Sequence, residues 1–149
     1  FHLEPLRLNP EKIKLEWLHT KSENYFDASS LSDGTLRFIC LAVLFLQPKE
    51  HLPSVILVDE PELGLHPSAI HLLYSMIRSA STNVQVIIST QSPILLDYFD
   101  PSEVLVAEQT DGSTKLSRLD PQSLKEWLDD YSLGELWEKN LIGGKPNNA

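Results

Sequence analysis

Two stretches of the chain are apolar at nearly every position and are short enough to be strands in the middle of a sheet. Residues 54–58 read Ser-Val-Ile-Leu-Val, and residues 84–89 read Val-Gln-Val-Ile-Ile-Ser. Strands that are apolar on both sides are usually central strands of a sheet that helices cover on both faces. Both stretches are therefore predicted to be buried strands.

Three helices are predicted around these strands, and they begin at Ser32, Pro67 and Ser92–Pro93. Serine can cap the free backbone amides of a first turn, and proline is favoured at the first helical position. The first helix is expected to end near Gln47 because Pro48 follows, and the second near Ala80. The first helix contains the longest apolar run, residues 38–46, which we interpret as a buried helix.

Polar and apolar residues alternate near both ends of the chain, which is typical of antiparallel hairpins. The predicted strands span residues 3–8, 13–18, 25–26, 103–107 and 115–119. The first hairpin, with its turn at Asn9–Pro10, forms a small N-terminal β segment, and the second turns at Asp111–Gly112. Two more helices are expected, one opening at Asp120–Pro121 and one at Ser132, which has capping-box spacing with Glu135.

Buried strands that alternate with helices favour an α/β fold with a mostly parallel sheet and flanking helices. The 149 residues, 42% hydrophobic, suit one domain over residues 1–142 with a flexible tail at 143–149. No apolar run approaches the roughly 20 residues that cross a bilayer, and no signal peptide is visible. The single cysteine, Cys40, lies in an apolar run and is predicted to be a buried, inert thiol. We expect a cytoplasmic protein with no membrane partner.

The chain is acidic, with 12 basic and 21 acidic residues and a formal net charge of −9. Proteins that bind nucleic-acid backbones generally display basic stripes, so this charge has the wrong sign for general binding. Any contact with DNA would come from a local patch or from sequence outside this chain.

Two adjacent carboxylates follow the first buried strand. In α/β sheets, ligands bind beyond the carboxyl ends of the strands, where Asp59 and Glu60 are expected to lie. Asp59 could hold Mg²⁺ directly or through water, and Glu60 could orient or deprotonate a water for attack on a γ-phosphate. The alternative is a strand that simply ends in charged surface residues.

A second candidate site precedes the first helix, where residues 31–35 read Leu-Ser-Asp-Gly-Thr. Ser32 and Gly34 leave a hydroxyl and free amides at the positive end of a helix dipole, an arrangement that binds phosphate. The alternative is an ordinary serine cap. Asp33 places a negative charge beside this presumed phosphate site.

Two more polar segments follow the buried strands: residues 62–67 read Glu-Leu-Gly-Leu-His-Pro, and residues 87–93 read Ile-Ile-Ser-Thr-Gln-Ser-Pro. Over roughly residues 25–110, the order and spacing of these motifs resemble the ABC ATPase family. The likeness is greatest to the ATPases grouped with the SMC, RecF and OLD proteins. The resemblance puts Ser32 and Gly34 on the signature motif, Asp59 and Glu60 on Walker B and its catalytic glutamate, His66 on the D-loop and Gln91 on the switch histidine.

This resemblance implies the C-terminal lobe of a P-loop NTPase head that sandwiches ATP in a dimer of heads. The residues implied to contact the nucleotide are Ser32, Gly34, Thr35 and His66. Asp59 would bind the Mg²⁺ that accompanies ATP, and Glu60 and Gln91 would be catalytic. The group resembled suggests a role in DNA repair or phage defence.

The sequence departs from the family pattern at two places that affect activity. It has no Gly-x-x-x-x-Gly-Lys-Ser/Thr motif, so the half that carries the P-loop is expected upstream or on another chain. We expect the isolated chain to be inactive. Gln91 stands where a histidine is expected, and it can donate a hydrogen bond but cannot carry a positive charge, which predicts slow hydrolysis.

Other interpretations remain open at this stage. The chain could be a non-catalytic, ABC-like interaction or regulatory module, or a Mg²⁺-dependent hydrolase that uses its acidic residues directly. His66 could simply start a helix. Arg37 could reach a phosphate or pair with a surface acid. Glu62 could line a dimer interface or be solvated.

Overall fold

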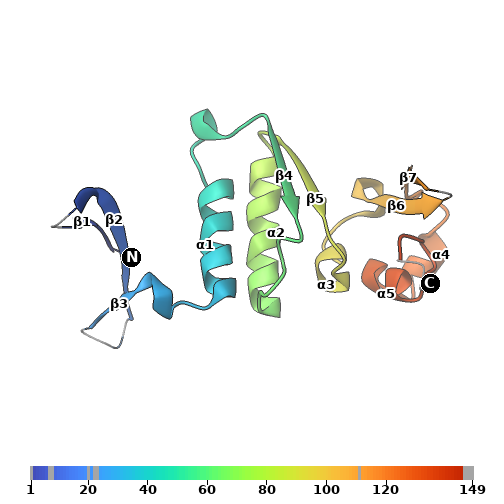
Figure 1. The fold of residues 1–149 in the computed structure, drawn as a ribbon. Coiled ribbons are helices and arrows are strands. Elements are labelled where there is room, and N and C mark those ends of the chain that lie inside the picture. Colours follow the sequence, from blue (N-terminus) through green and yellow to red (C-terminus); the bar gives the residue numbers. More distant parts are fainter. Residues whose placement is uncertain (1, 7–8, 20, 22–23, 111, 146–149) are drawn as a thin grey trace.

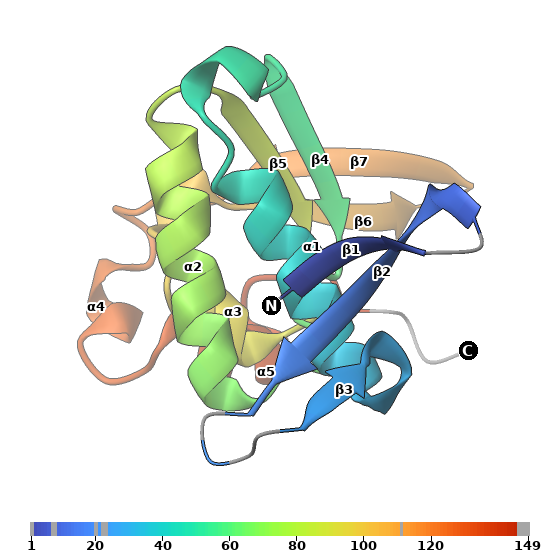
Figure 2. The ribbon, with the colours of Figure 1, turned by 90° about the vertical axis from the view of Figure 1, so that its left-hand side faces the viewer.

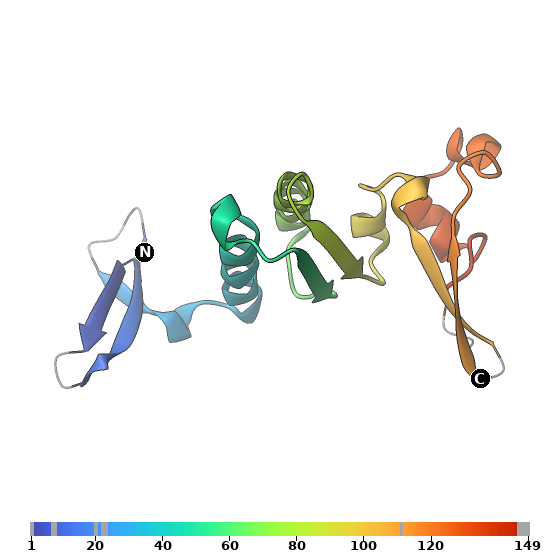
Figure 3. The ribbon, with the colours of Figure 1, turned by 90° about the horizontal axis from the view of Figure 1, so that it is seen from above.

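The computed structural model describes residues 2–6, 9–19, 21, 24–110 and 112–145. Within these residues the chain forms three small sheets with helices between and after them. Figures 1 and 3 show the elements following one another along the molecule, from an N-terminal sheet through a central α/β unit to a C-terminal hairpin and helices. None of the helices in the described part of the chain is both long and apolar enough to cross a membrane.

The central unit is a parallel strand pair joined by a helix. Strands β4 (Val55–Asp59) and β5 (Gln85–Ser89) pair in parallel, and α2 (Pro67–Ser81) is the crossover between them. Helix α1 (Asp33–Phe45) lies beside α2, as Figures 1 and 2 show. The α/β class is confirmed, and the crossover brings the carboxyl ends of both strands to one edge of the sheet.

The hydrophobic core lies between these two helices and one face of the strand pair. Leu73 and Ile77 of α2 pack with Phe45 of α1 and Ile56 of β4. Burial of these side chains supplies the main favourable free energy that holds the helices on the sheet.

The prediction that the two strands are covered on both faces is wrong. Leu57 is 74% exposed and Val55 49%, and Ile87 on β5 is 45% exposed. These side chains point away from α1 and α2, because successive side chains of a strand alternate between its faces and the helices cover one face only.

The apolar run in α1 is also only partly buried. Val43 and Leu46 are 63% and 62% exposed, and Cys40 is exposed, so the predictions of a buried helix and a buried thiol are wrong. One face of the helix contacts α2 and β4, and the opposite face is apolar without being covered by the described residues.

Local capping residues set most helix boundaries, as predicted. Ser32, Ser92 and Ser132 each accept a backbone N–H at the start of α1, α3 (Pro93–Leu96) and α5 (Leu133–Glu138). Helix α3 is a single turn. The helix expected from Asp120 begins later, as α4 (Lys125–Leu128), because the Asp120 carboxylate accepts the N–H of Gln122 and forms a turn instead. Short 3₁₀ turns span Ala28–Ser30, Lys49–His51 and Pro101–Glu103.

The N-terminal sheet is antiparallel, with β1 (His2–Leu6), β2 (Asn9–Leu18) and β3 (Tyr25–Asp27) in that order. The predicted turn residues Asn9 and Pro10 lie inside β2, since Leu6 already pairs with Asn9.

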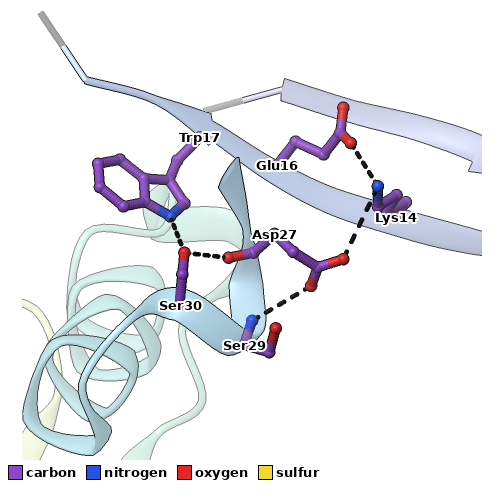
Figure 4. Close-up of polar contacts among 6 residues, drawn as sticks. All are labelled: Lys14, Glu16, Trp17, Asp27, Ser29 and Ser30. Atoms are coloured by element: carbon purple, nitrogen blue, oxygen red, sulfur yellow. Dashed lines mark hydrogen bonds and ion pairs between the residues drawn. The ribbon is translucent and has the colours of Figure 1, made fainter. Parts of the chain in front are cut away.

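Polar contacts join this sheet to the 3₁₀ turn that leads to α1 (Figure 4). The indole Nε1 of Trp17 donates to Ser30 Oγ at 3.0 Å, and Ser30 Oγ donates to the Asp27 carbonyl at 2.6 Å. Lys14 Nζ lies 2.5 Å from a Glu16 carboxylate oxygen and 3.7 Å from Asp27 Oδ2.

The C-terminal hairpin pairs β6 (Leu105–Thr110) with β7 (Ser113–Arg118) as predicted, although its turn residue Asp111 lies outside the described residues. Of the predicted tail, residues 143–145 lie against the hairpin and α5. Lys145 Nζ donates to the Glu138 carbonyl at 2.5 Å. Residues 146–149 lie outside the described part of the chain.

Candidate functional site

The predicted acid Asp59 ends β4 directly opposite Ser89, which ends β5. The Ser89 hydroxyl donates a hydrogen bond to Asp59 Oδ1. Asp59 is exposed, on the face of the sheet that the helices do not cover. A carboxylate whose side chain is exposed and fixed at the carboxyl edge of a parallel sheet is well placed to meet a ligand.

Glu60 is connected to the end of β5 through both its backbone and its side chain. Its N–H donates to the Ser89 carbonyl at 2.9 Å, and its Oε1 accepts a 3.0 Å hydrogen bond from Gln91 Nε2. Its φ of 43° lies in the left-handed region that side-chain-bearing residues rarely adopt. The structure therefore brings the two predicted catalytic residues into direct contact.

A second hydrogen bond, between Thr90 and Glu62, joins the same two segments as the Glu60–Gln91 contact. Thr90 Oγ1 donates to Glu62 Oε1 at 2.5 Å and accepts the N–H of Ser92 at 3.0 Å. Glu62 is 8% exposed, and its Oε2 has no hydrogen-bond partner in the described part of the chain. The sequence left open whether Glu62 is solvated or lines a dimer interface, and this burial fits neither alternative. The Glu62 side chain instead holds the loop that carries Gln91.

The start of α1 packs closely on the turn that follows β4. A Cβ atom added to Gly34 would lie 2.2 Å from the carbonyl oxygen of Gly64, so only glycine permits this approach. Ser32 Oγ accepts the N–H of Thr35 at 3.2 Å and lies 2.8 Å from Thr35 Oγ1. Ser32 is thus a helix cap, and its hydroxyl and that of Thr35 are exposed.

Arg37 connects α1 to Glu60. Its Nη1 donates to the backbone carbonyl of Glu60 at 3.3 Å, and it forms no ion pair with any described residue. The pairing with a surface acid considered from the sequence is not observed among the described residues. The residues are 23 positions apart, and no local pattern indicates the contact.

The sequence over residues 2–97 matches the family described as "AAA domain, putative AbiEii toxin, Type IV TA system". This match covers more than half of the chain. The chain belongs to this family of AAA-type ATPases. No curated protein sequence matches it.

Solved heads of SMC ATPases share the fold of this AAA-family chain. A structure from work on "ATP-driven dimerization and DNA stimulated activation of SMC ATPases" aligns with a TM-score of 0.61 at 18% identity, over 80% of this chain and 72% of its own. An SMC head bound to the C-terminal winged-helix domain of ScpA has the same TM-score and identity, over 77% of this chain and 34% of its own.

A third match is the Smc head of Pyrococcus furiosus with an extended coiled coil, bound to the C-terminal domain of ScpA. Its TM-score is 0.60 at 20% identity, over 82% of this chain and 31% of its own. This chain thus spans about a third of the length of the two heads bound to ScpA. The prediction of an ATPase of this kind is confirmed by the family, and the predicted likeness to SMC heads is confirmed at the level of the fold.

His66 caps a helix in this AAA-family chain. Its Nδ1 accepts the N–H of Ser68 at 3.3 Å and lies 2.9 Å from the Ser68 hydroxyl, at the start of α2. No hydrogen bond among the described residues joins Ser32, Thr35 or His66 to the Asp59–Glu60–Gln91 group.

The residues at the strand ends fit the Mg²⁺ that accompanies ATP in such ATPases. No group of three or more His, Cys, Asp or Glu side chains in the described ranges is arranged to hold a metal by itself. Mg²⁺ commonly takes one or two protein oxygens and completes its shell with water and substrate phosphates. Asp59 offers such an oxygen, because Ser89 occupies Oδ1 and its other oxygen accepts no described hydrogen bond.

Proposed function

We propose that this chain is the C-terminal part of an ATP-hydrolysing head that works as a dimer. The observation that carries the proposal is the contact between Glu60 and Gln91 beside Asp59, at the carboxyl ends of two parallel strands. Such an edge is where α/β proteins bind ligands, and these groups suit phosphate hydrolysis.

Each residue at the edge has a distinct part in the proposal. Asp59 would hold Mg²⁺, which neutralises the charge of the phosphates. Glu60 orients the attacking water and accepts its proton. Gln91 fixes the Glu60 carboxylate through its amide N–H and can donate its second N–H to the γ-phosphate. Since glutamine cannot gain a proton, it gives less stabilisation of developing charge than the histidine of related heads, and hydrolysis is slow.

In this proposal, the start of α1 contacts the phosphates of the ATP that the facing head of the dimer holds. Ser32, Gly34 and Thr35 lie in its exposed first turn, where backbone N–H groups and the helix dipole favour phosphate. The Ser32 hydroxyl can donate to a phosphate oxygen while it still accepts the Thr35 N–H, because a hydroxyl has one donor and two acceptor sites. His66, exposed at the start of α2, faces nucleotide or the other head in the same assembly.

The half that carries the P-loop covers the open face of β4 and β5. The chain exposes 10853 Å², whereas a folded monomer of 16.8 kDa exposes about 7700 Å². Part of this excess is apolar, around Leu57 and Ile87 on the sheet and Val43 on α1. Leu57 and Ile87 lie directly opposite each other on the two strands, and exposed apolar surface of this kind marks an interface next to Asp59.

The proposed biological process rests on the matching structures and on the description of the family. One matching structure concerns SMC ATPases that are stimulated by DNA, and the family description names a toxin of a toxin–antitoxin system. We propose a role in DNA repair or phage defence in the cytoplasm. With a net charge of −9, this chain leaves DNA contact to other regions of the protein.

A non-catalytic interaction module is the second candidate, and Gln91 is the observation that favours it. Against it stands the fixed geometry of both acids: Asp59 is held by Ser89, and Glu60 by Gln91. A module without turnover has no need for these contacts at the ligand edge.

ATP turnover by the full-length protein, with and without a Glu60→Gln substitution, tests the proposal. We expect Mg²⁺-dependent turnover that falls at least about a hundredfold in Glu60→Gln, because the variant lacks the base. Glu126→Gln on α4, an exposed residue away from the site, is the matched control and should leave turnover unchanged. ATP binding without any turnover in the unsubstituted protein would favour the interaction module.

A further inference from the structure

Glu60 holds an unfavourable backbone conformation at the position where the proposed chemistry occurs. Glu60 and Asn140 are the non-glycine residues with positive φ in the described part of the chain, and Glu60 has a φ of 43°. Such a conformation persists only when surrounding contacts enforce it. The contacts that fix this residue therefore determine where its carboxylate lies.

Four hydrogen bonds from three segments of the chain hold Glu60. Ser89, at the end of β5, accepts its N–H, and Gln91 donates to its carboxylate. Its carbonyl oxygen accepts the other two, from the N–H of Leu63 in the turn after β4 at 3.2 Å and from Arg37 Nη1 at 3.3 Å. Ser89 and Gln91 belong to the same sheet edge as Glu60, whereas Arg37 belongs to α1.

Helix α1 meets the turn after β4 at two points about one helical turn apart. Gly34 lies against the Gly64 carbonyl without room for a side chain, and Arg37 reaches the Glu60 carbonyl. Arg37 has no carboxylate partner among the described residues, and its guanidinium instead donates to this carbonyl. A shift of α1 therefore changes the support of the Glu60 backbone.

We propose that Arg37 is a positioning residue that couples the first turn of α1 to the catalytic acid of the same chain. This inference rests on the proposed function, in which that first turn touches nucleotide held by the facing head. Contact with the nucleotide seats α1, Arg37 then holds the Glu60 carbonyl, and the carboxylate is aligned with the attacking water. Each head thus hydrolyses its own ATP in response to the nucleotide bound by its partner.

The test is steady-state ATP turnover of the full-length protein with Arg37→Ala and Arg37→Lys. For Arg37→Ala we expect kcat to fall about tenfold and KM to stay within about twofold, since the lost hydrogen bond positions the acid and does not bind ATP. Arg37→Lys keeps one N–H donor and should recover most of kcat. Arg78→Ala, which removes an arginine of α2 paired with Glu103, is the matched control and should leave kcat unchanged.

A second measurement separates positioning from nucleotide binding. In a Glu60→Gln background, ATP-dependent head dimerisation should be the same with and without Arg37→Ala. A raised KM or lost dimerisation would mean that Arg37 contacts nucleotide, and an unchanged kcat in Arg37→Ala would mean that the contact has no catalytic role; either result overturns the inference and leaves the proposed function intact. Absence of turnover in the unsubstituted protein overturns the proposed function itself, and the inference with it.

Discussion

Gln91 donates a hydrogen bond to Glu60 across the carboxyl ends of β4 and β5, at 3.0 Å between Nε2 and Oε1. In the proposed function, the glutamine does two things that a catalytic partner must do: it orients the acid, and it keeps a second N–H for a phosphate oxygen. A third role, to stabilise the phosphates with positive charge, is not open to glutamine because its side chain stays neutral.

Substitutions of Gln91 should separate these effects. Gln91→Leu removes both amide donors, and we expect ATP turnover by the full-length protein to fall roughly tenfold to a hundredfold. Gln91→His restores a ring N–H that can become charged and should equal or exceed the unsubstituted rate. Gln109→Leu on the exposed part of β6 is the control. Equal rates for Gln91→Leu and Gln109→Leu would remove Gln91 from the mechanism.

Thr90 should matter for stability because it satisfies a buried carboxylate. Thr90→Val keeps the shape of the side chain but leaves Glu62 without its hydroxyl donor and Ser92 without its acceptor. We expect destabilisation by about 1–3 kcal/mol, seen as a lower melting temperature. Thr90→Ser keeps the hydroxyl and should melt close to the unsubstituted protein. If Val and Ser variants melt alike, the Glu62 contact does not contribute.

Gly34 should tolerate no side chain. In Gly34→Ala the new Cβ meets the Gly64 carbonyl at 2.2 Å, so α1 must move away from the turn after β4. We expect a loss of about 1–3 kcal/mol and, because the same movement draws Arg37 from Glu60, a fall in kcat. Gly112→Ala has open space around its Cβ and a positive φ, so it should lower the melting temperature without affecting kcat.

Acid should weaken one contact between the central unit and the C-terminal part. The pKa of Glu103 lies below its ordinary value of 4.5, first because the Asp100 backbone N–H donates to its carboxylate and then because Arg78 lies beside it. A lowered folded pKa means that the carboxylate stabilises the fold above about pH 4.5 and that this contribution is lost as the pH falls through the folded pKa.

Melting curves of the unsubstituted protein and Glu103→Gln between about pH 3 and pH 7 check this sign. The two proteins should differ most near neutral pH and converge in acid, where a protonated Glu103 resembles glutamine. Glu126→Gln is the control and should show no such convergence. A difference that grows as the pH falls would contradict the prediction.

The open apolar face should be required for assembly with the P-loop half. Leu57→Glu places a charge on this face, away from the core, and we expect the P-loop half no longer to co-purify with this chain when the two are expressed as separate polypeptides. Leu116→Glu changes a similarly exposed leucine of β7 and should have no effect. Unaltered co-purification of Leu57→Glu would show that another surface makes the contact.

Local signals in the sequence predicted most of the elements correctly. Ser32 and Ser132 cap helices as expected, since a side-chain cap depends on only three or four neighbouring residues. The parallel sheet was also predicted, and a parallel crossover brings the ends of β4 and β5 to one edge whatever the details of packing.

Burial and long-range contacts could not be predicted in the same way. Leu57 and Cys40 lie in apolar runs, yet whether a run is covered depends on what packs against it, and the described chain covers one face only. The contact of Arg37 with a backbone carbonyl 23 positions away depends on how α1 sits on the turn after β4. No pattern of residue types encodes that placement.

The open face of β4 and β5 also bears on how the protein is made. Within the described part of the chain, this two-stranded sheet has no further strand at either edge, and it exposes Leu57 and Ile87; such apolar edges are templates for aggregation. If the proposed P-loop half is encoded upstream, which is one of the two arrangements that the sequence predicts, the surface that covers this face leaves the ribosome first. The covering surface would then already be present when the sheet forms, and the order of synthesis would protect the sheet from aggregation.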